Sequence, residues 1–321
     1  MKNLPFLSLL LSFGIIVALV NFAPDNSGPQ VSSTDGAYSF LSTGHIYGAP
    51  NLWASADPSA RQQVFPAASL LSFTDQIDSL GADFLMLLGD NVLYGDSDSY
   101  EALETSFLNK LELPVFSIIG NHDRLNDLDG QADKRHEELF GPLYQSFKKG
   151  SEYYILLDTG DSNSSFMAEE QLDFLRKEIA EAKEDLDVLN VFIFTHKLVW
   201  TQNNEELHNI VYWFFPNYKN GIVGDSNLGE LMPDILALAE EKNIYWGSGD
   251  IKDLYPAFYY FDENQNITYF ATSLNDSQDD VMFRVNISET AEVSFETISL
   301  FDGNVVPASE FGEELWTSLR D

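Results

Sequence analysis

The sequence predicts an α/β protein in which buried strands alternate with amphipathic helices. Three observations indicate this fold class. Short apolar runs such as FLMLL at residues 84–88 alternate with segments whose apolar residues recur at helical spacing. After residue 256 the chain becomes rich in short β-prone runs that are separated by turns. Polar side chains follow several of the apolar runs directly, as they do at the carboxyl edge of a parallel sheet.

Three helices are predicted in the first 250 residues. In the first, Leu70, Phe73 and Ile77 recur at helical spacing, and Gly81 ends the helix because glycine readily takes left-handed backbone angles. The other two helical patterns cover residues 172–182 and 235–239. The strands that follow these three helices are predicted at residues 84–88, 188–194 and 244–246.

The last third of the chain predicts an antiparallel continuation of the sheet or a second sheet. Four short β-rich runs occur there, and turns such as residues 262–265 separate them. These runs are AFYYFD, ITYFATS, VMFRVNIS and AEVSFETISL. We therefore place one domain at residues 37–303 and a C-terminal tail with helical potential at residues 304–321.

The N-terminal segment predicts export. A mostly apolar run of 19 residues extends from Leu4 to Phe22, a length close to that of a single membrane span. Lys2 precedes this run, which favours a cytoplasmic N-terminus and places the remainder outside the cytoplasm. Residues 1–23 are expected to be a signal peptide or a membrane anchor, followed by a flexible tether at 24–36. The expected location is the periplasm, the extracellular space or the outer face of the cytoplasmic membrane.

The charge and the cysteine count exclude several classes of function. The chain carries 17 basic and 51 acidic residues, a net charge of −34, and such a surface repels the phosphate backbone of nucleic acids. There are no cysteines, so disulfides, thiolate metal ligands and cysteine nucleophiles are all excluded. Any metal ion must therefore be held by histidine, carboxylate, amide or backbone oxygen ligands.

Polar residues follow five predicted strands at the point where each strand ends, and these strands read SFLST, FLMLL, VFSII, VFIFT and IYW. These residues are His45, Asp90, the run Asn121-His122-Asp123, His196 and Asp250. Because the carboxyl ends of neighbouring strands converge on one crevice, we expect these side chains to lie close together. Buried imidazoles and carboxylates are costly unless something pairs them, and a shared cation offsets that cost. The mixed nitrogen and oxygen set suits zinc, manganese or iron.

The ordered motifs resemble the signature of the calcineurin-like metallophosphoesterase superfamily. GHIYG, GDNVLYG, GNHDR, FTHK and GSGD fall in the order D-x-H, GD-x-x-x-x-G, GNH-D/E, a lone histidine and GH-x-H. The resemblance covers residues 38 to 300. It implies a sandwich of two mixed β-sheets flanked by helices, and two metal ions that share a bridging aspartate. It also implies attack of a metal-bound water on the phosphorus of a phosphate ester.

Carried over residue by residue, the resemblance implies a set of five metal ligands. Asp90 would bridge the two ions. His45 would bind the first ion together with Asp250, and Asn121 and His196 would bind the second. The expected cofactor is one or two divalent ions of manganese, iron or zinc.

The same resemblance implies two catalytic residues and contains two departures. His122 would protonate the leaving oxygen or steady the transferring phosphoryl group, and Asp123 would orient His122. The aspartate of the first motif, however, falls on Thr43, and the first histidine of the last motif falls on Ser248. The second histidine of that motif falls on Asp250, which offers a carboxylate in its place.

These observations predict an exported, metal-dependent phosphoesterase acting on a phosphate mono- or diester. The substrate class remains open between small-molecule, lipid and saccharide phosphate esters, and membrane attachment would run through residues 4–22. The alternative is a non-catalytic binding protein of the same fold with an incomplete metal site, which Thr43 and Ser248 favour. A third hypothesis is a cation-binding acidic protein, since residues 94–101 and 125–133 partly match calcium loops.

Two further histidines and one long segment lie away from the predicted strand ends. His136 and His208 lie in charged runs and are expected to be solvated. The aromatic, irregular segment from residue 201 to 227 is expected to be a loop that shapes the substrate pocket.

Overall fold

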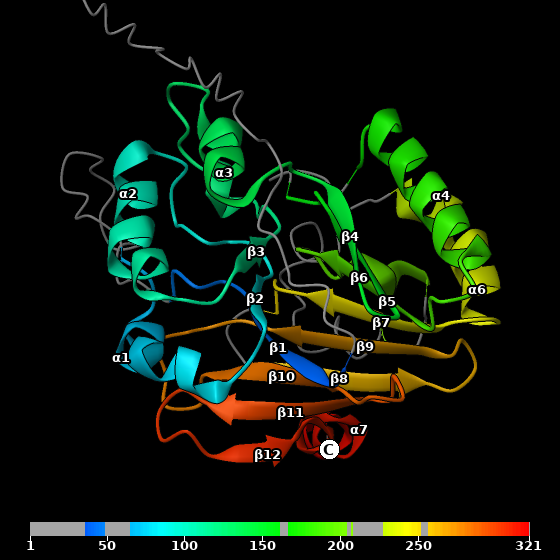
Figure 1. The fold of residues 1–321 in the computed structure, drawn as a ribbon. Coiled ribbons are helices and arrows are strands. Elements are labelled where there is room, and N and C mark those ends of the chain that lie inside the picture. Colours follow the sequence, from blue (N-terminus) through cyan, green and yellow to red (C-terminus); the bar gives the residue numbers. More distant parts are fainter. Residues whose placement is uncertain are drawn as a thin grey trace, which may run out of the picture.

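The computed structural model describes residues 36–48, 65–160, 166–203, 207, 227–251 and 256–320. Its strands form two six-stranded sheets that pack face to face, with helices on both outer sides, and this confirms the predicted two-sheet α/β sandwich (Figure 1). The predicted signal or anchor segment and nearly all of the tether lie outside the described residues. Among the described residues, no helix is both long and apolar enough to cross a bilayer.

The first sheet has the strand order β12-β11-β10-β1-β2-β3. Its three early strands run parallel. Strand β10 pairs antiparallel with β1, and β11 and β12 follow it, each antiparallel to the strand before. The strands are β1 (Tyr38–Thr43), β2 (Phe84–Leu87), β3 (Val115–Ser117), β10 (Val281–Ile287), β11 (Val293–Ser299) and β12 (Val305–Pro307). The helices on its side are α1 (Ala68–Ile77), α2 (Ser97–Ser106) and α3 (Ala132–Phe140).

The second sheet has the strand order β4-β5-β6-β7-β9-β8. Its four central strands are parallel, and the two edge strands are antiparallel. The strands are β4 (Gln145–Lys149), β5 (Glu152–Leu157), β6 (Asn190–Thr195), β7 (Asn243–Ser248), β8 (Ala257–Asp262) and β9 (Ile267–Thr272). Helices α4 (Glu169–Glu184) and α6 (Met232–Ala239) cover its outer face.

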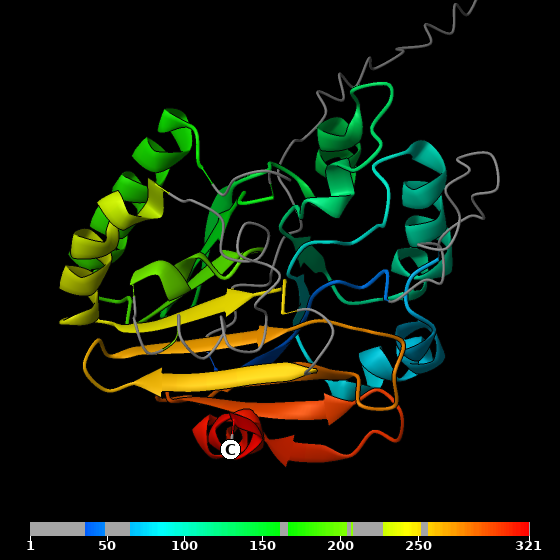
Figure 2. The same ribbon diagram turned by 180° about the vertical axis from the view of Figure 1, so that it is seen from behind.

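The core between the sheets is aromatic. Phe40 and Phe84 of the first sheet stack at 4.8 Å between ring centroids, and Tyr154 and Phe192 of the second sheet stack at 5.0 Å. Phe40 meets Tyr154 edge to face across the interface, at 5.8 Å. Strands whose two faces are both covered read as continuous apolar runs, which is why residues 84–88 and 188–194 were recognisable. Figure 2 shows the two sheets and the helices on their outer sides from behind.

The predicted helices are present, and the first ends as expected. A short 3-10 turn at Asp78–Leu80 follows α1, and Gly81 closes it in the left-handed conformation, with φ of 70°. The pair β4–β5 was not expected from the sequence. Strand β4 is short, and its polar sequence QSFKK lacks an apolar run.

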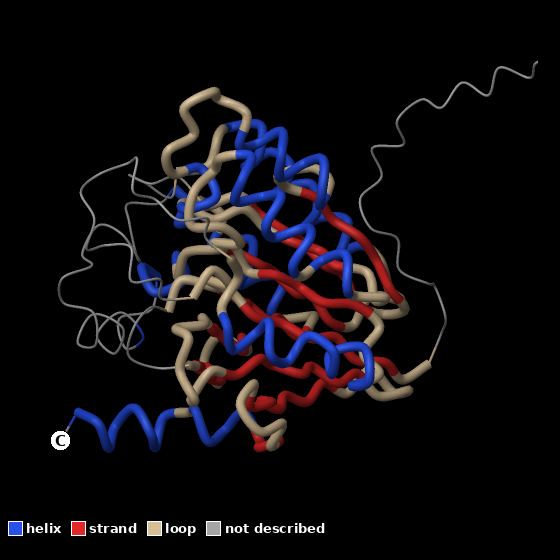
Figure 3. Tube along the Cα trace, turned by 90° about the vertical axis from the view of Figure 1, so that its left-hand side faces the viewer, coloured by secondary structure: helices blue, strands red, loops and turns tan. Residues whose placement is uncertain are grey.

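The last third of the chain is divided between the two sheets. The hairpin β8–β9 extends the second sheet beside β7, whereas β10, β11 and β12 extend the first sheet beside β1. After residue 303 the chain therefore adds the edge strand β12 before it forms α7 (Glu313–Arg320). Figure 3 shows α7 leading away from the sheets at the C-terminus.

Candidate active site

The ends of five strands meet at one place between the two sheets. Strands β1 and β2 are joined there by a hydrogen bond from the His45 amide to the Gly89 carbonyl, at 2.9 Å. On the second sheet, the His196 carbonyl accepts hydrogen bonds from the amides of Gly249 and Asp250, each at 3.0 Å. A Cβ atom on Gly249 would collide with the Leu88 carbonyl. Glycine at this position therefore lets the two sheets approach closely enough to share one site.

Asp90 lies at the centre of this site. It is buried and has a positive φ of 56°, a strained conformation for a residue other than glycine. Its Oδ1 atom accepts a hydrogen bond from the His122 amide at 2.9 Å and lies 3.2 Å from His196 Nε2. Its Oδ2 atom lies 4.0 Å from His45 Nε2 and has no hydrogen-bond partner. The carboxylate thus faces an imidazole on each side.

Backbone carbonyls orient the two imidazoles beside Asp90. The Nδ1 atom of His196 lies 2.9 Å from the Leu88 carbonyl, and Nδ1 of His45 lies 3.0 Å from the Leu274 carbonyl. A carbonyl can only accept, so Nδ1 carries the proton in each ring. In the neutral rings Nε2 then presents a lone pair toward Asp90, the arrangement found in metal-binding histidines.

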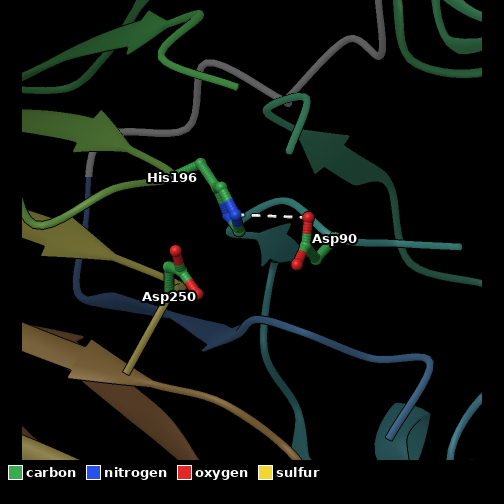
Figure 4. A group of neighbouring side chains, drawn as sticks. All are labelled: Asp90, His196 and Asp250. Carbon is green, nitrogen blue, oxygen red and sulfur yellow. Dashed lines mark ion pairs between the residues drawn. The ribbon is translucent and has the colours of Figure 1, made fainter. Parts of the chain in front are cut away.

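Asp250 brings a second carboxylate to Asp90 and His196. Each of the three residues offers a ligand atom, and these atoms all lie within 4.8 Å of one another. Figure 4 shows the three side chains pointing toward one another from the ends of β2, β6 and β7. All three are buried, and they bring polar atoms of the first and second sheets together.

The charges of the group act strongly on one another. Burial works to lower the pKa of His196, but the Asp90 carboxylate raises it further, to about 9. Burial likewise works to raise the pKa of Asp90, but the neighbouring imidazoles, His196 foremost, hold it well below its ordinary value. Asp90 is therefore ionised at neutral pH, and a proton or another cation is needed between it and His196.

These residues fit a divalent cation. Neutral His196 would aim a nitrogen lone pair at a carboxylate oxygen only 3.2 Å away, which is repulsive without a cation. One Asp90 oxygen and the His196 Nε2 atom have no hydrogen-bond partner, although both are buried. Imidazole nitrogen and carboxylate oxygen together suit zinc, manganese or iron.

The loop after β3 carries Asn121 and brings His122 to the site. Gly120, which precedes them, packs so closely on Asp90 that a Cβ atom there would collide with the Asp90 backbone. The His122 ring lies 6.3 Å from the His45 ring between centroids, and its Nδ1 atom is 3.3 Å from the Leu93 carbonyl. The structure therefore brings together Asp90, His196 and Asp250, with His45 and His122 beside them and Asn121 next along the loop.

Asp123, which the resemblance implies as the residue orienting His122, binds the loop that carries Asp90. Its carboxylate accepts hydrogen bonds from the backbone amides of Asp90, Asn91, Val92 and Gly120, at 2.6–3.0 Å. Burial and the Asp90 charge raise its pKa to about 7, against the pull of these amides. Asp123 thus holds the loop that carries Asp90, while the Leu93 carbonyl orients the His122 ring.

The two departures from the motif are both buried, but only one is fully hydrogen-bonded. The Ser248 hydroxyl lies 3.0 Å from the Thr195 hydroxyl and accepts a hydrogen bond from the Trp200 indole at 2.9 Å. The Thr43 hydroxyl is buried without a hydrogen-bond partner. Ser248 therefore belongs to a structural network, whereas Thr43 leaves a polar atom unsatisfied near the site.

The expectation that His136 is solvated was wrong. His136 is fully buried in α3, in ring contact with Phe140. Burial lowers its pKa to about 3. The signal was present in the sequence, because Ala132, His136 and Phe140 recur every four residues and form the buried face of the helix. His208 and nearly all of the segment at 201–227 lie outside the described residues.

The acidic segments that partly match calcium loops cap helices. Asp96 accepts a hydrogen bond from the Ser99 amide at the start of α2. Asp127 accepts from the Gln131 and Ala132 amides at the start of α3, and Asp129 pairs with Arg135. Their carboxylates are therefore engaged in helix capping and ion pairs.

Tyr47 is a site residue that the sequence did not indicate. It is buried, and its ring lies 4.0 Å from the His45 ring and 4.8 Å from the His122 ring between centroids. It thus forms a shared wall beside both histidines. The only sequence signal is its position two residues after His45, which is too weak to act on.

The chain is similar in sequence and fold to known phosphatases. A family model described as calcineurin-like phosphoesterase matches residues 53–258. Tartrate-resistant acid phosphatase type 5 of Mus musculus is 25% identical over 163 residues, which cover 39% of this chain and 47% of that protein. A purple acid phosphatase from yellow lupin (Lupinus luteus) seeds shares the fold, with a TM-score of 0.57 and 12% identity, over 87% of this chain and 54% of its own. The chain thus spans 47% and 54% of the lengths of these two relatives.

Proposed function

This chain belongs to the calcineurin-like phosphoesterase family, and from that premise we propose that it is a metal-dependent hydrolase of phosphoric esters. One observation carries the proposal: Asp90, His196 and Asp250 converge into a buried group with ligand atoms within 4.8 Å of one another. A divalent cation held there would lower the pKa of a bound water to roughly 7 and would stabilise negative charge on phosphoryl oxygens. The acid phosphatase relative supports the same class of reaction.

The remaining residues of the site have separate tasks in this proposal. Asp123 fixes the loop that carries Asp90 by accepting its backbone amides, so the carboxylate stays aimed into the site. His122, held through Nδ1 by the Leu93 carbonyl, offers its other ring nitrogen to a phosphoryl oxygen or to the leaving oxygen. Tyr47 keeps the rings of His45 and His122 in place.

The proposed substrate is a small phosphate mono- or diester. The net charge of −34 disfavours nucleic acids and other long polyanions as substrates. Esters of lipids and saccharides remain within the proposal, as does export or membrane attachment through residues 4–22. Fractionation of cells into cytoplasm, membrane and medium, followed by immunoblotting, tests the proposed location; a wholly cytoplasmic protein would contradict it.

The enzymatic proposal is tested by Asp90→Asn with p-nitrophenyl phosphate as substrate. Loss of the central carboxylate removes several kcal/mol of transition-state stabilisation, so we expect kcat/KM to fall at least about a thousandfold. Asp98→Asn is the matched control, because Asp98 is exposed on α2, and it should leave turnover unchanged. Unchanged turnover in Asp90→Asn would rule out the mechanism.

A second function is favoured by one observation. Ser248 forms hydrogen bonds with Thr195 and Trp200, and Thr43 stands where the family signature has an aspartate. The set of metal ligands expected for the family is therefore incomplete. The chain would then be a binding protein that uses the fold without catalysis. Elemental analysis separates the two functions, because less than about one transition-metal ion per chain after reconstitution would favour the binding protein.

A further inference from the structure

We propose that this site holds one divalent cation, bound by Asp90, His196 and Asp250, and that Thr43 leaves a second position unfilled. The inference rests on the proposed function and deepens it, because it specifies the number of ions and their ligands. The resemblance assigns Asp250 to one metal ion and His196 to another. In the structure, the ligand atoms of both residues and of Asp90 all lie within 4.8 Å of one another, so the three form one group around a single position.

Hydrogen bonds to the backbone hold the three proposed ligands of the single ion in place. His196 donates from Nδ1 to the Leu88 carbonyl at 2.9 Å, so Nε2 is the nitrogen that faces Asp90. The Asp250 amide is bonded to the His196 carbonyl at 3.0 Å, which ties the two ligands together through the backbone. Asp90 is held by the backbone bonds of its loop to Asp123. The three ligands are therefore preorganised, as a tight metal site requires.

On the opposite side of Asp90, the described residues supply His45 and no second carboxylate. His45 Nε2 is 4.0 Å from Asp90 Oδ2, and Thr43 stands where the family signature has an aspartate. The Thr43 hydroxyl is neutral and buried, and it finds no hydrogen-bond partner among the described residues. Asp123 cannot replace the missing charge, because both of its oxygens accept backbone amides. A second ion on this side would therefore share the charge of Asp90 with the first.

Ser248 cannot complete a second position on the other side. Its hydroxyl accepts from the Trp200 indole at 2.9 Å and pairs with the Thr195 hydroxyl at 3.0 Å. The Thr195 hydroxyl is itself engaged, since it bonds the Lys197 carbonyl and accepts from Trp246. Turning Ser248 toward the site would leave the buried indole N–H of Trp200 without this acceptor.

Charge balance favours the same count. Asp90 and Asp250 carry two negative charges, which neutralise one divalent ion and leave a buried site without net charge. A second divalent ion would leave two uncompensated positive charges in a region where Asp90, His196 and Asp250 are all buried. Uncompensated buried charge is strongly unfavourable, so the second ion would bind far more weakly than the first.

The experiment counts the ions. The full chain is stripped with a chelator, reconstituted with excess Zn²⁺ or Mn²⁺, passed through a desalting column and analysed for metal by mass spectrometry. We expect about one ion per chain in the wild type and in His45→Ala, and a more than tenfold loss in His196→Ala and Asp250→Asn. Asp279→Asn, at an exposed carboxylate, is the control and should retain one ion. Thr43→Asp supplies the missing carboxylate and should raise the count to about two.

The outcomes separate the inference from the proposed function. Two ions in the wild type would overturn the inference and leave the hydrolase proposal standing. One ion that His45→Ala removes and Asp250→Asn retains would place it elsewhere and would also overturn the inference. No ion in the folded wild type would overturn both. Circular dichroism checks that each variant is folded, and if Thr43→Asp is not, the wild type and His45→Ala decide the question.

Discussion

The parallel strands of the two sheets carry one polar cluster at their carboxyl ends, the carboxyl edge, and another at their amino ends, the amino edge. The two clusters differ in whether their polar atoms have hydrogen-bond partners. At the carboxyl edge, Asp90 and His196 retain buried atoms without hydrogen-bond partners. At the amino edge lies a second group, which we call the amino-edge network. It consists of Tyr38, Asp83, Lys149, Glu152, Tyr154 and Asn190.

The amino-edge network ties the first sheet to the second through direct bonds. The Tyr38 hydroxyl is 2.6 Å from the Tyr154 hydroxyl and donates to Glu152 at 3.0 Å. Asn190 donates to the other Glu152 oxygen at 3.0 Å. Lys149, almost fully buried, pairs with Asp83 at 3.1 Å. Polar side chains of each sheet thus find partners on the other.

The difference separates a structural lock from a ligand site. A buried polar group without a partner costs about 1–3 kcal/mol, so most such groups are satisfied by the protein, by water or by a ligand. The amino-edge network satisfies its own groups and needs no ligand. The carboxyl edge leaves carboxylate and imidazole atoms facing one another, which a bound cation would satisfy. Breaking each cluster should therefore change a different measurable quantity.

The largest effect is expected from Lys149→Met in the amino-edge network. Removing the ammonium leaves Asp83 without its cation and removes the positive charge of the residue paired with buried Glu152 across β4 and β5. We expect the free energy of unfolding, measured in urea, to fall by about 3 kcal/mol. Lys148→Met is the matched control, since Lys148 forms a half-exposed pair with Asp185, and it should cost less than about 1 kcal/mol. Equal losses in the two variants would mean that the network is not a lock.

The second effect tests the carboxyl edge in the same terms. A cation that binds only the folded chain should raise the free energy of unfolding by about 2.7 kcal/mol at a hundred times its Kd. We expect this increment, measured in urea with and without Zn²⁺ or Mn²⁺, in the wild type and in Lys149→Met, but not in His196→Ala. If Lys149→Met lost the increment while remaining folded, the two edges could not be treated as independent.

The smallest effect concerns His136, a buried imidazole outside both clusters. Its ring nitrogens make no hydrogen bond of normal geometry, although the Ser117 backbone lies beside them. Burial lowers its pKa from the ordinary 6.5 to about 3. The unfolded chain therefore gains a proton as pH falls through 6.5 and the folded chain does not. Stability is present above pH 6.5 and is lost between that pH and about 3.

At pH 5 this loss should amount to about 2 kcal/mol relative to pH 7. The measurement compares urea unfolding of the wild type and His136→Leu at the two pH values. Other groups titrate in both proteins, so the difference between their two pH dependences isolates His136. Equal pH dependence in the two proteins would show that His136 does not contribute, and that an unsatisfied buried imidazole need not be costly here.

Much of the fold was readable from the sequence because it rests on local periodicity. Leu70, Phe73 and Ile77 mark the buried face of α1, and the apolar runs at 84–88 and 188–194 mark strands covered on both faces. The polar residues that end these strands, such as Asp90 and His196, were also readable, because each directly follows its strand. Position along the chain was enough for all of these.

The sequence did not determine how the last third divides, because strand pairing is a long-range property. Runs of the same composition form β8–β9 beside β7 and β10–β12 beside β1. Likewise, the surroundings of His136 depended on which face of α3 packs inward. The surrounding charged residues suggest an exposed helix, and only the four-residue spacing of Ala132, His136 and Phe140 indicates the buried face.

The sequence by itself therefore determined which side chains stand at the ends of the strands. Only the tertiary structure decided which of them meet. Asp123 accepts hydrogen bonds from the Asp90 loop, and Ser248 accepts one from Trp200, whereas Asp250 lies beside His196 as a candidate ligand. The spacing of these residues along the chain does not distinguish the three outcomes. The physical reason is that hydrogen bonds and metal ligands act over about 3 Å, while the packing of two sheets decides which strand ends come that close.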